Sequence, residues 1–271
     1  MVASINSFGL SPGFLKGVNE GQEKEKSALE KISSGNQLNS AADNAAGIAI
    51  IERFASQISG FGQAIRNASD ATSITQTAEA ILSTAGEDIQ KIRELSVASA
   101  NASLSDNDRA NLQSQVEQLQ DQVRTSFDQA NVNGVDFFKS ESTQSFQVGA
   151  NADETIDIST RDLSSDIAVI SRLDISTQSG AQSALSAIDN VLQTFNDQQV
   201  DLGVLSNRLD SSISNLQNNK VNTQEASSRI KDTDVAKEVS QQINGQIQQQ
   251  SGIAVQSQAN SNARLVLQLL S

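Results

Sequence analysis

The sequence predicts a mainly α fold, a long antiparallel coiled-coil-like helical bundle with a small β-hairpin region at its tip and with the N- and C-terminal helices paired. Three observations support this prediction. Apolar residues recur at spacings of three and four over stretches far longer than an ordinary helix. The single proline is Pro12, so no later proline interrupts a helix. Only one short region changes to the alternating period of β-strands.

The composition favours thin helical seams over a thick globular core. The chain has 271 residues, of which 37% are apolar, a fraction below the usual range for globular domains. Aromatic residues make up 3%, and all of them are Phe. Such a chain buries its apolar surface best along narrow contacts between long helices.

Charge and missing residue types exclude several classes of function. The formal net charge is −13, and the sequence has no run of Lys or Arg of the kind that binds the phosphates of nucleic acid. Both features argue against nucleic acid and anionic membranes as partners. No apolar run is long enough to span a bilayer, and the first residues do not read as a cleavable signal peptide. The chain has neither Cys nor His, which removes zinc sites and Ser-His-Asp catalysis. We therefore expect no enzyme, no metal and no cofactor.

The first helix, expected over 14–33, is weakly amphipathic. Too little apolar surface is available to offset the entropy of ordering an isolated helix. Gly35 fits the left-handed position that ends a helix, and Asp43 is expected to cap the start of the next one. The apolar positions of the first helix are Phe14, Val18, Leu29 and Ile32.

Two strongly periodic helices follow. The stretch 43–100 repeats Ile, Phe and Ala at spacings of three and four, and its 1.5 Å rise per residue gives a helix of roughly 87 Å. Ser105 and Asp108 form a variant capping box that opens a helix over 106–128. Both helices carry a continuous apolar stripe, so we expect them to pack against each other.

A β region of about 135–160 separates these helices from two more. Short segments with alternating apolar residues and Gly or Asn turns predict strands there. Long helices are then expected over 178–222 and 233–270. The last helix has apolar residues at a spacing of four and ends in a Leu-rich cluster: Val235, Val239, Ile243, Ile247, Leu265, Leu267, Leu269 and Leu270.

The order of the elements is nearly symmetric, with a weak arm at each end. Folding back at the β region buries the three strong stripes in an antiparallel bundle and brings both arms to one end. The arms could be frayed ends or segments that fold on assembly. The C-terminal Leu cluster favours assembly, because a free tail of this kind promotes association.

Three local patterns imitate functional motifs. Gly60-Phe61-Gly62 lacks the third glycine of a dinucleotide loop and falls within a helix, so close packing or a slight bend is expected. The segment 105–109, "SDNDR", resembles the start of a calcium loop but lacks later ligands. Asn67 begins a glycosylation triplet of a kind that often occurs by chance.

Several segments resemble the bacterial flagellin family in the right order. "KISSGNQLNSAADNAAGIAI", from residue 31, is similar to the N-terminal signature, and "IQKIRELSVASAN", from residue 89, resembles a stretch that follows it. "SFQVGANADETIDI" is similar to the family's β segment. "IKDTDVAKEVS" and the ending "QANSNARLVLQLLS" resemble its C-terminal block. The first 30 residues depart from the family by being richer in Gly and Glu.

The resemblance implies a self-polymerising subunit of the flagellar filament, exported without a cleaved signal and located outside the cell. Residues 1–42 with 228–271 would form the terminal coil domain in the filament core, and 43–227 the helical rod around it. Expected partners are further copies of the chain, an export chaperone at the C-terminal helix, other flagellins, and cap and junction proteins. The alternatives are a hook–filament junction protein and a soluble coiled-coil interaction protein.

The resemblance also assigns two sites by position. A recognition patch, covered by neighbouring subunits in filaments and read on monomers by a vertebrate toll-like receptor, would comprise Gln90, Lys91, Arg93, Glu94, Leu95 and Gln115. Lys91 and Gln115 stand where many receptor-active relatives have Arg and Glu. A spoke that joins the terminal arm to the rod would contain Gly35, Gln37 and Asp43, and Gln37 stands where the family often has Arg.

Overall fold

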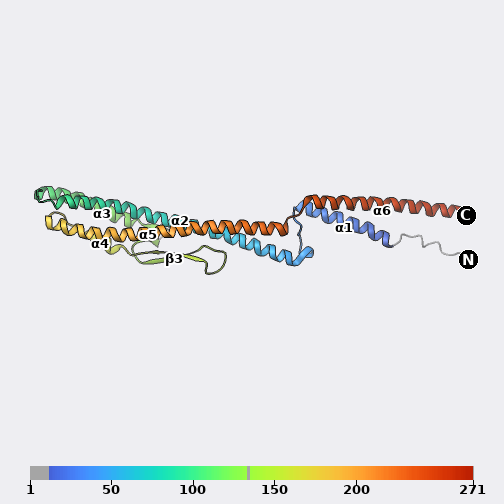
Figure 1. Cartoon of the computed structure of the whole chain (residues 1–271), viewed down its shortest axis with the longest axis horizontal. Coiled ribbons are helices and arrows are strands. Elements are labelled where there is room, and N and C mark those ends of the chain that lie inside the picture. Colours follow the sequence, from blue (N-terminus) through green and yellow to red (C-terminus); the bar gives the residue numbers. More distant parts are fainter. Residues whose placement is uncertain (1–11, 133–134, 271) are drawn as a thin grey trace. The chain divides into compact units, whose positions relative to one another are not determined.

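A computed structural model describes residues 12–132 and 135–270 and confirms the mainly α class (Figure 1). The side chains of Phe14, Leu267, Leu269 and Leu270 lie outside the described residues. The elements in chain order are α1 (Pro12–Ser34), α2 (Ala41–Ser99), α3 (Asp106–Asp128), β1 (Asn131–Val132), β2 (Val135–Asp136), β3 (Ser142–Gln147), β4 (Thr155–Thr160), α4 (Ser164–Ile170), α5 (Gln178–Lys231) and α6 (Val235–Leu270).

Three details differ from the sequence-based expectation. The β hairpin was expected at the tip of the bundle, where the chain folds back, but it lies alongside α2 and α5, and the chain reverses at the turn between α2 and α3 instead. Helix α5 continues to Lys231 instead of ending near residue 222, because no proline or left-handed glycine stops it there. The short helix α4 was not predicted, since seven residues are too few to show a period.

The chain divides into two compact units. One contains residues up to Ser56 together with Asn222–Ser271, and the other contains Gln57–Val221. The division falls inside α2 and α5, not at the predicted boundaries of 42/43 and 227/228. Those boundaries describe parts of a filament and stay predictions.

In the unit of residues 57–221, α2 and α5 run antiparallel (Figure 1). Arg93 of α2 pairs with Asp189 of α5, with 2.7 Å between Nε and Oδ1. Further along, a Cβ atom added at Gly62 would meet the Lys220 ammonium group. Helix α3 lies along α2, where the side chain of Gln122 donates a 3.4 Å hydrogen bond to Asp88.

The core of this unit is a long seam between the three helices. Most of the fully buried side chains on α2, α3 and α5 are aliphatic residues at helical spacing, which confirms the predicted stripes. At one place Phe127 contacts both Phe138 and Phe195, with ring centroids 5.5 and 5.6 Å apart. The fully buried members include Leu82, Ile89, Ile92, Val116, Val123, Ile188 and Leu202.

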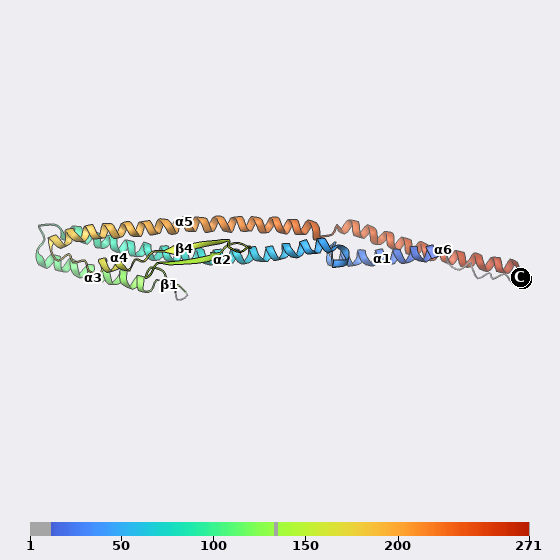
Figure 2. The ribbon, with the colours of Figure 1, turned by 90° about the horizontal axis from the view of Figure 1, so that it is seen from below.

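The antiparallel hairpin β3–β4 lies against α2 and α5, as Figure 2 shows. Ile156 and Ile158 point into a small cluster with Leu205 and Leu209 of α5. The hairpin turn approaches α2 so closely that a Cβ at Gly60 would lie 3.0 Å from the Cβ of Ala150. Close packing at Gly60, not a nucleotide loop, is therefore confirmed.

In the other unit, α1 and α6 pack as an antiparallel pair (Figure 2). The pairing begins at the end of α1, where Thr233 N donates to the carbonyl of Gly35 at 3.1 Å and Asn36 bridges to Asp232. The predicted pairing of the terminal helices is thus confirmed.

Candidate assembly interface

Helices α1 and α6 approach each other most closely at glycine, and none of the described Val, Leu or Ile side chains of this pair is fully buried. A Cβ atom at Gly245 would lie 2.9 Å from the carbonyl oxygen of Gly21, so the two backbones touch where side chains would normally stand. The side chain of Gln246 adds a 3.0 Å hydrogen bond to the Glu25 carboxylate. The residues buried in this unit's helix pair are Gly21, Ala28, Glu238, Gly245 and Gly252.

The branched aliphatic side chains of α6 face away from this contact. We call Val235, Val239, Ile243 and Ile247 the outer stripe. Their exposed fractions are 51%, 37%, 49% and 53%. Ile253, Val255 and Leu265 of α6 are more than half exposed. Leu29 on α1 is 45% exposed. Val18 and Ile32 of α1 are half-buried. The pair of helices α1 and α6 therefore leaves the outer stripe of α6 exposed, although α1 packs alongside it.

The sequence of α6 explains this division into two faces. Glu238, Gly245 and Gly252 recur every seven residues, which places them on one side of the helix and next to α1. The outer stripe recurs every four residues on another side. Sequence reasoning found the stripe but missed the glycine face, although the seven-residue spacing was a usable signal.

The segment between α1 and the long part of α2 contains the three residues of the predicted spoke, and their role in a filament stays a prediction. Gly35 has φ of +68°, the left-handed conformation that was predicted for it. The amide of Gln37 donates a 2.6 Å hydrogen bond to the carbonyl of Lys231, so its backbone ties the segment to the end of α5. The side chain of Gln37 is exposed.

The prediction that Asp43 caps α2 was wrong. Asn44 is the residue with non-helical backbone angles, and its Oδ1 accepts from the amide of Gly47 at 3.0 Å, which is the capping bond of the long helix. The Asp43 carboxylate instead accepts from the amides of Asn39 and Ser40. These two hydrogen bonds, Asn39 first, lower the pKa of Asp43.

The residues of the recognition patch are mostly exposed. Lys91 forms an ion pair with Glu94 at 2.6 Å, while the hydrogen bond to Asp189 raises the pKa of Arg93. Leu95 is half-buried against the core of its unit. Gln90 on α2 and Gln115 on α3 are exposed.

Two kinds of site were sought within the described ranges. No described helix is long and apolar enough to cross a membrane. Residues 12–132 and 135–270 also contain no cluster of three or more acidic, His or Cys side chains that could hold a metal ion. Asn67, which begins a glycosylation triplet, uses its side-chain amide to donate a 3.0 Å hydrogen bond to the carbonyl of Gln147.

Long helical seams and a terminal helix pair with an uncovered apolar stripe define a class of protein, the self-associating structural proteins. Sequence comparison makes the assignment specific. The bacterial flagellin N-terminal helical region matches residues 5–143, and the bacterial flagellin C-terminal helical region matches residues 185–270.

The chain is 39% identical to the flagellin of Halalkalibacterium halodurans over 256 residues, which cover 93% of each protein. It is 32% identical to the flagellar filament 30.7 kDa core protein of Treponema maltophilum over the full length of both. The chain belongs to the bacterial flagellin family. It is a structural subunit of the flagellar filament, polymerises with copies of itself, and is not an enzyme.

Solved structures agree at the level of the fold. The Bacillus cereus flagellin aligns with a TM-score of 0.51 and 22% identity over 56% of this chain and 88% of that one. A putative flagellar hook-associated protein from Vibrio parahaemolyticus aligns with a TM-score of 0.60 and 17% identity over 70% of this chain and 100% of that one. At 17% identity, the likeness to the hook-associated protein shows a shared fold only. The hook–filament junction alternative is therefore weaker than the assignment as a filament subunit.

Proposed function

We propose that the α1–α6 pair is the surface through which copies of this subunit join in the filament. Residues 1–42 and 228–271 form the terminal coil domain in this proposal, and 43–227 form the helical domain around it. The observation that carries it is the outward orientation of the outer stripe while glycine fills the contact with α1.

The energetics support an interface between copies. Completing the burial of a half-exposed Val or Ile stabilises a contact by about 1 kcal/mol. The outer stripe alone supplies four such side chains per copy. Leu265, and the Leu residues at 267, 269 and 270 whose side chains lie outside the described residues, extend the same proposal to the end of α6.

The same surface fits an export chaperone before assembly. An exposed aliphatic stripe on a long helix promotes association, so a partner that covers α6 would keep the subunit from polymerising inside the cell. We propose such a chaperone at α6, followed by export and an extracellular location. A chain without Cys needs no oxidation to fold after export. Other flagellins, cap and junction proteins would then contact the same terminal helices.

We further propose that the recognition patch contacts neighbouring subunits in the filament and a host toll-like receptor on free subunits. Arg93, Lys91 and Glu94 offer charges on the surface of α2, and the partly exposed Leu95 lies beside them. In this proposal the spoke, through Gly35, Gln37 and Asp43, sets the direction of the arm that carries α1.

Filament formation by outer-stripe variants tests the main proposal. Ile243→Ser combined with Ile247→Ser should abolish filaments in electron micrographs and leave the far-ultraviolet circular dichroism spectrum of the subunit unchanged. Val221→Ser is the matched control, because Val221 is 50% exposed on α5, outside the α1–α6 pair. Normal filaments from the double variant would refute the role of the stripe.

A further inference from the structure

The contact between α1 and α6 repeats along both helices. On α6 the buried positions that face α1 are Glu238, Gly245 and Gly252, which follow a seven-residue period. On α1, Gly21 and Ala28 are buried and also lie seven residues apart. The register is the axial position of one helix along the other. A shared period allows more than one register, because a shift by one heptad brings the same faces together again.

Two glycines define the register seen in the structure. A Cβ atom at Gly21 would lie 3.3 Å from the carbonyl oxygen of Gly245 and 3.5 Å from the Cβ of Gln248. The helices are antiparallel (Figure 2), so seven residues further along α1 correspond to seven residues back along α6. Ala28 therefore lies at the level of Glu238. In this register glycine meets glycine once, and an acid meets Ala at the next position.

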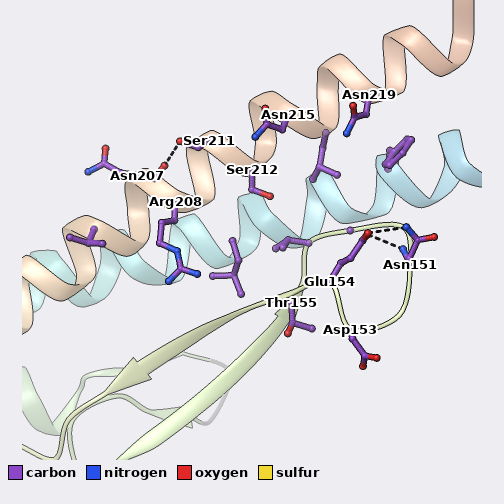
Figure 3. Close-up of a pocket in the computed structure, with 16 residues that line it drawn as sticks. Asn151, Asp153, Glu154, Thr155, Asn207, Arg208, Ser211, Ser212, Asn215 and Asn219 are labelled. Atoms are coloured by element: carbon purple, nitrogen blue, oxygen red, sulfur yellow. Dashed lines mark hydrogen bonds between the residues drawn. The ribbon is translucent and has the colours of Figure 1, made fainter.

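Glu238 is the buried acid of this contact. It is 4% exposed, and its Oε2 accepts no hydrogen bond from the residues that the structure describes. By contrast, the Glu154 carboxylate at the β3–β4 turn accepts from both the amide and the side chain of Asn151 (Figure 3). A buried carboxylate oxygen without a donor costs free energy. The observed register is therefore destabilised at Glu238.

A shift of α1 by one heptad toward the C-terminal end of α6 would remove this cost. Gly21 would then face Gly252. Ala28 would face Gly245, so small residues would meet at both positions. Glu238 would lie beyond the end of α1, where water reaches its carboxylate. The shift is about 10.5 Å, because seven residues each rise 1.5 Å.

The same shift would bring two valines together. In the structure Val18 of α1 lines a hollow of about 420 Å³ together with Gly17, Gln248 and Gly252. After the shift Val18 would lie at the level of Val255, seven residues beyond Gln248. Val255 is 57% exposed in the structure. The second register would therefore replace a buried acid with apolar contact.

Two hydrogen bonds favour the observed register. The side chain of Gln246 donates to the Glu25 carboxylate at 3.0 Å, and Ile253 would take the place of Gln246 after the shift. The amide of Thr233 donates to the carbonyl of Gly35 at 3.1 Å, at the end of α1 that would move away. The two registers thus differ by opposing contributions, since each satisfies groups that the other leaves without a partner.

We propose that the α1–α6 pair of the free subunit exchanges between two registers one heptad apart, and that the buried carboxylate of Glu238 keeps the second register accessible. The exchange is a property of one subunit and does not depend on the role of the outer stripe in filaments. It decides which part of α6 stays uncovered. The observed register exposes Val255, whereas the second register exposes Glu238.

Disulfide trapping tests the proposal, because the chain has no Cys. Gly21→Cys with Gln248→Cys reports the observed register, since the two Cβ atoms would lie 3.5 Å apart. Gly21→Cys with Val255→Cys reports the second register, because without the shift Val255 lies about 10.5 Å too far along α6. In dilute free subunits we expect both variants to form an intramolecular disulfide, the first variant faster.

Gly21→Cys with Ala254→Cys is the control for helices that merely separate. Ala254 lies at the height of Val255 but on the opposite face of α6, as the helical period places it. Separated helices would oxidise both pairs alike, whereas a register shift joins only the pair with Val255. We expect the Val255 pair to form its disulfide at least tenfold faster than the Ala254 pair. Equal rates would overturn the proposal.

A second reporter leaves Gly21 unchanged. Ala28 and Gln248 are one heptad too far apart in the observed register and come opposite each other only after the shift. Ala28→Cys with Gln248→Cys should therefore form an intramolecular disulfide in a subunit whose circular dichroism spectrum stays helical. Absence of this disulfide from the folded subunit would also overturn the proposal.

Two substitutions should move the balance in opposite directions. Glu238→Gln replaces the buried charge with a neutral amide, so the disulfide of the second reporter should form at least threefold more slowly. Gln246→Ala removes the hydrogen bond to Glu25 and should make it form at least threefold faster. Glu30→Gln changes an exposed acid of α1, with the same effect on net charge, and should leave the rate unchanged. Equal effects of Glu238→Gln and Glu30→Gln would overturn the role of Glu238.

Discussion

Helices α5 and α6 use similar aliphatic residues in opposite ways. On α5, Ile188 and Leu209 are fully buried against the helices of their unit. On α6, Ile243 and Ile247 remain about half exposed although a partner helix lies alongside. The difference comes from the residues at each helix contact. The aliphatic stripe of α5 packs against α2 and α3, whereas α6 packs against α1 through glycine.

This contrast separates folding from assembly. Buried aliphatic side chains stabilise the subunit itself, because their transfer from water is complete within one copy. Half-exposed ones can still release free energy when a second copy covers them. Most of the burial that stabilises a single subunit therefore lies in residues 57–221. The α1–α6 pair instead has exposed apolar side chains that a second copy can cover.

The largest expected effect follows from removing α6. Deleting residues 233–271 should abolish polymerisation completely and leave the unit of residues 57–221 folded, since its core contains no residue of α6. Electron microscopy and thermal melting followed by circular dichroism measure the two outcomes. Filaments from the truncated chain would show that assembly does not need the terminal pair.

The contrast can be sharpened with matched aliphatic truncations. Ile188→Ala should lower the free energy of unfolding by about 2–5 kcal/mol because it leaves a cavity in a closed seam. Ile243→Ala should lower it by about 0.5 kcal/mol or less in the monomer. Urea unfolding of both variants measures the difference. Equal losses would mean that the outer stripe belongs to the subunit's own core.

The glycine contact predicts an intermediate effect. Gly245→Ala places a methyl group 2.9 Å from the carbonyl of Gly21, so the helices must separate and local stability should fall by about 1–3 kcal/mol. Gly17→Ala is the control, because its Cβ would meet nothing within 4 Å. That change should stabilise α1 by about 0.5–1 kcal/mol. Amide hydrogen exchange in α1 and α6 reports both changes.

The smallest effect concerns pH and the spoke. The pKa of Asp43 is lower in the folded chain than its ordinary value, so the ionised carboxylate stabilises the turn at neutral pH. This contribution is lost as the pH falls through the lowered pKa. Asp43→Asn should therefore lower the melting temperature slightly at pH 7 and make no difference near pH 2. A difference that grows with acidity would contradict the assignment.

Much of the fold could be predicted from the sequence because long helices repeat their signal many times. The period of the apolar residues located α2, α3 and α5 within a few residues, except where α5 continues to Lys231. The cap of α2 could not be assigned, because Asp43 and Asn44 are adjacent and both favour such positions. Only the geometry shows that Asn44 caps the helix while Asp43 holds the turn before it.

The candidate interface was only partly predictable. A four-residue spacing reveals the outer stripe, but not which neighbour covers it. The outer stripe faces away from α1 because Gly21 and Gly245 form the contact between the two helices. These residues are far apart in the chain, so local sequence does not reveal their contact. The ion pair between Arg93 and Asp189 could not be predicted from local sequence patterns either, because the two residues lie on different helices.

The reactivity of a single thiol in the outer stripe tests the central claim most directly. Since the chain has no Cys, Ile243→Cys gives one site for a maleimide label, and its labelling rate can be compared between free subunits and filaments. We expect rapid labelling in the monomer, where Ile243 is about half exposed, and at least tenfold slower labelling in the filament. Equal rates in the two states would contradict the account, because the outer stripe would then not lie between copies.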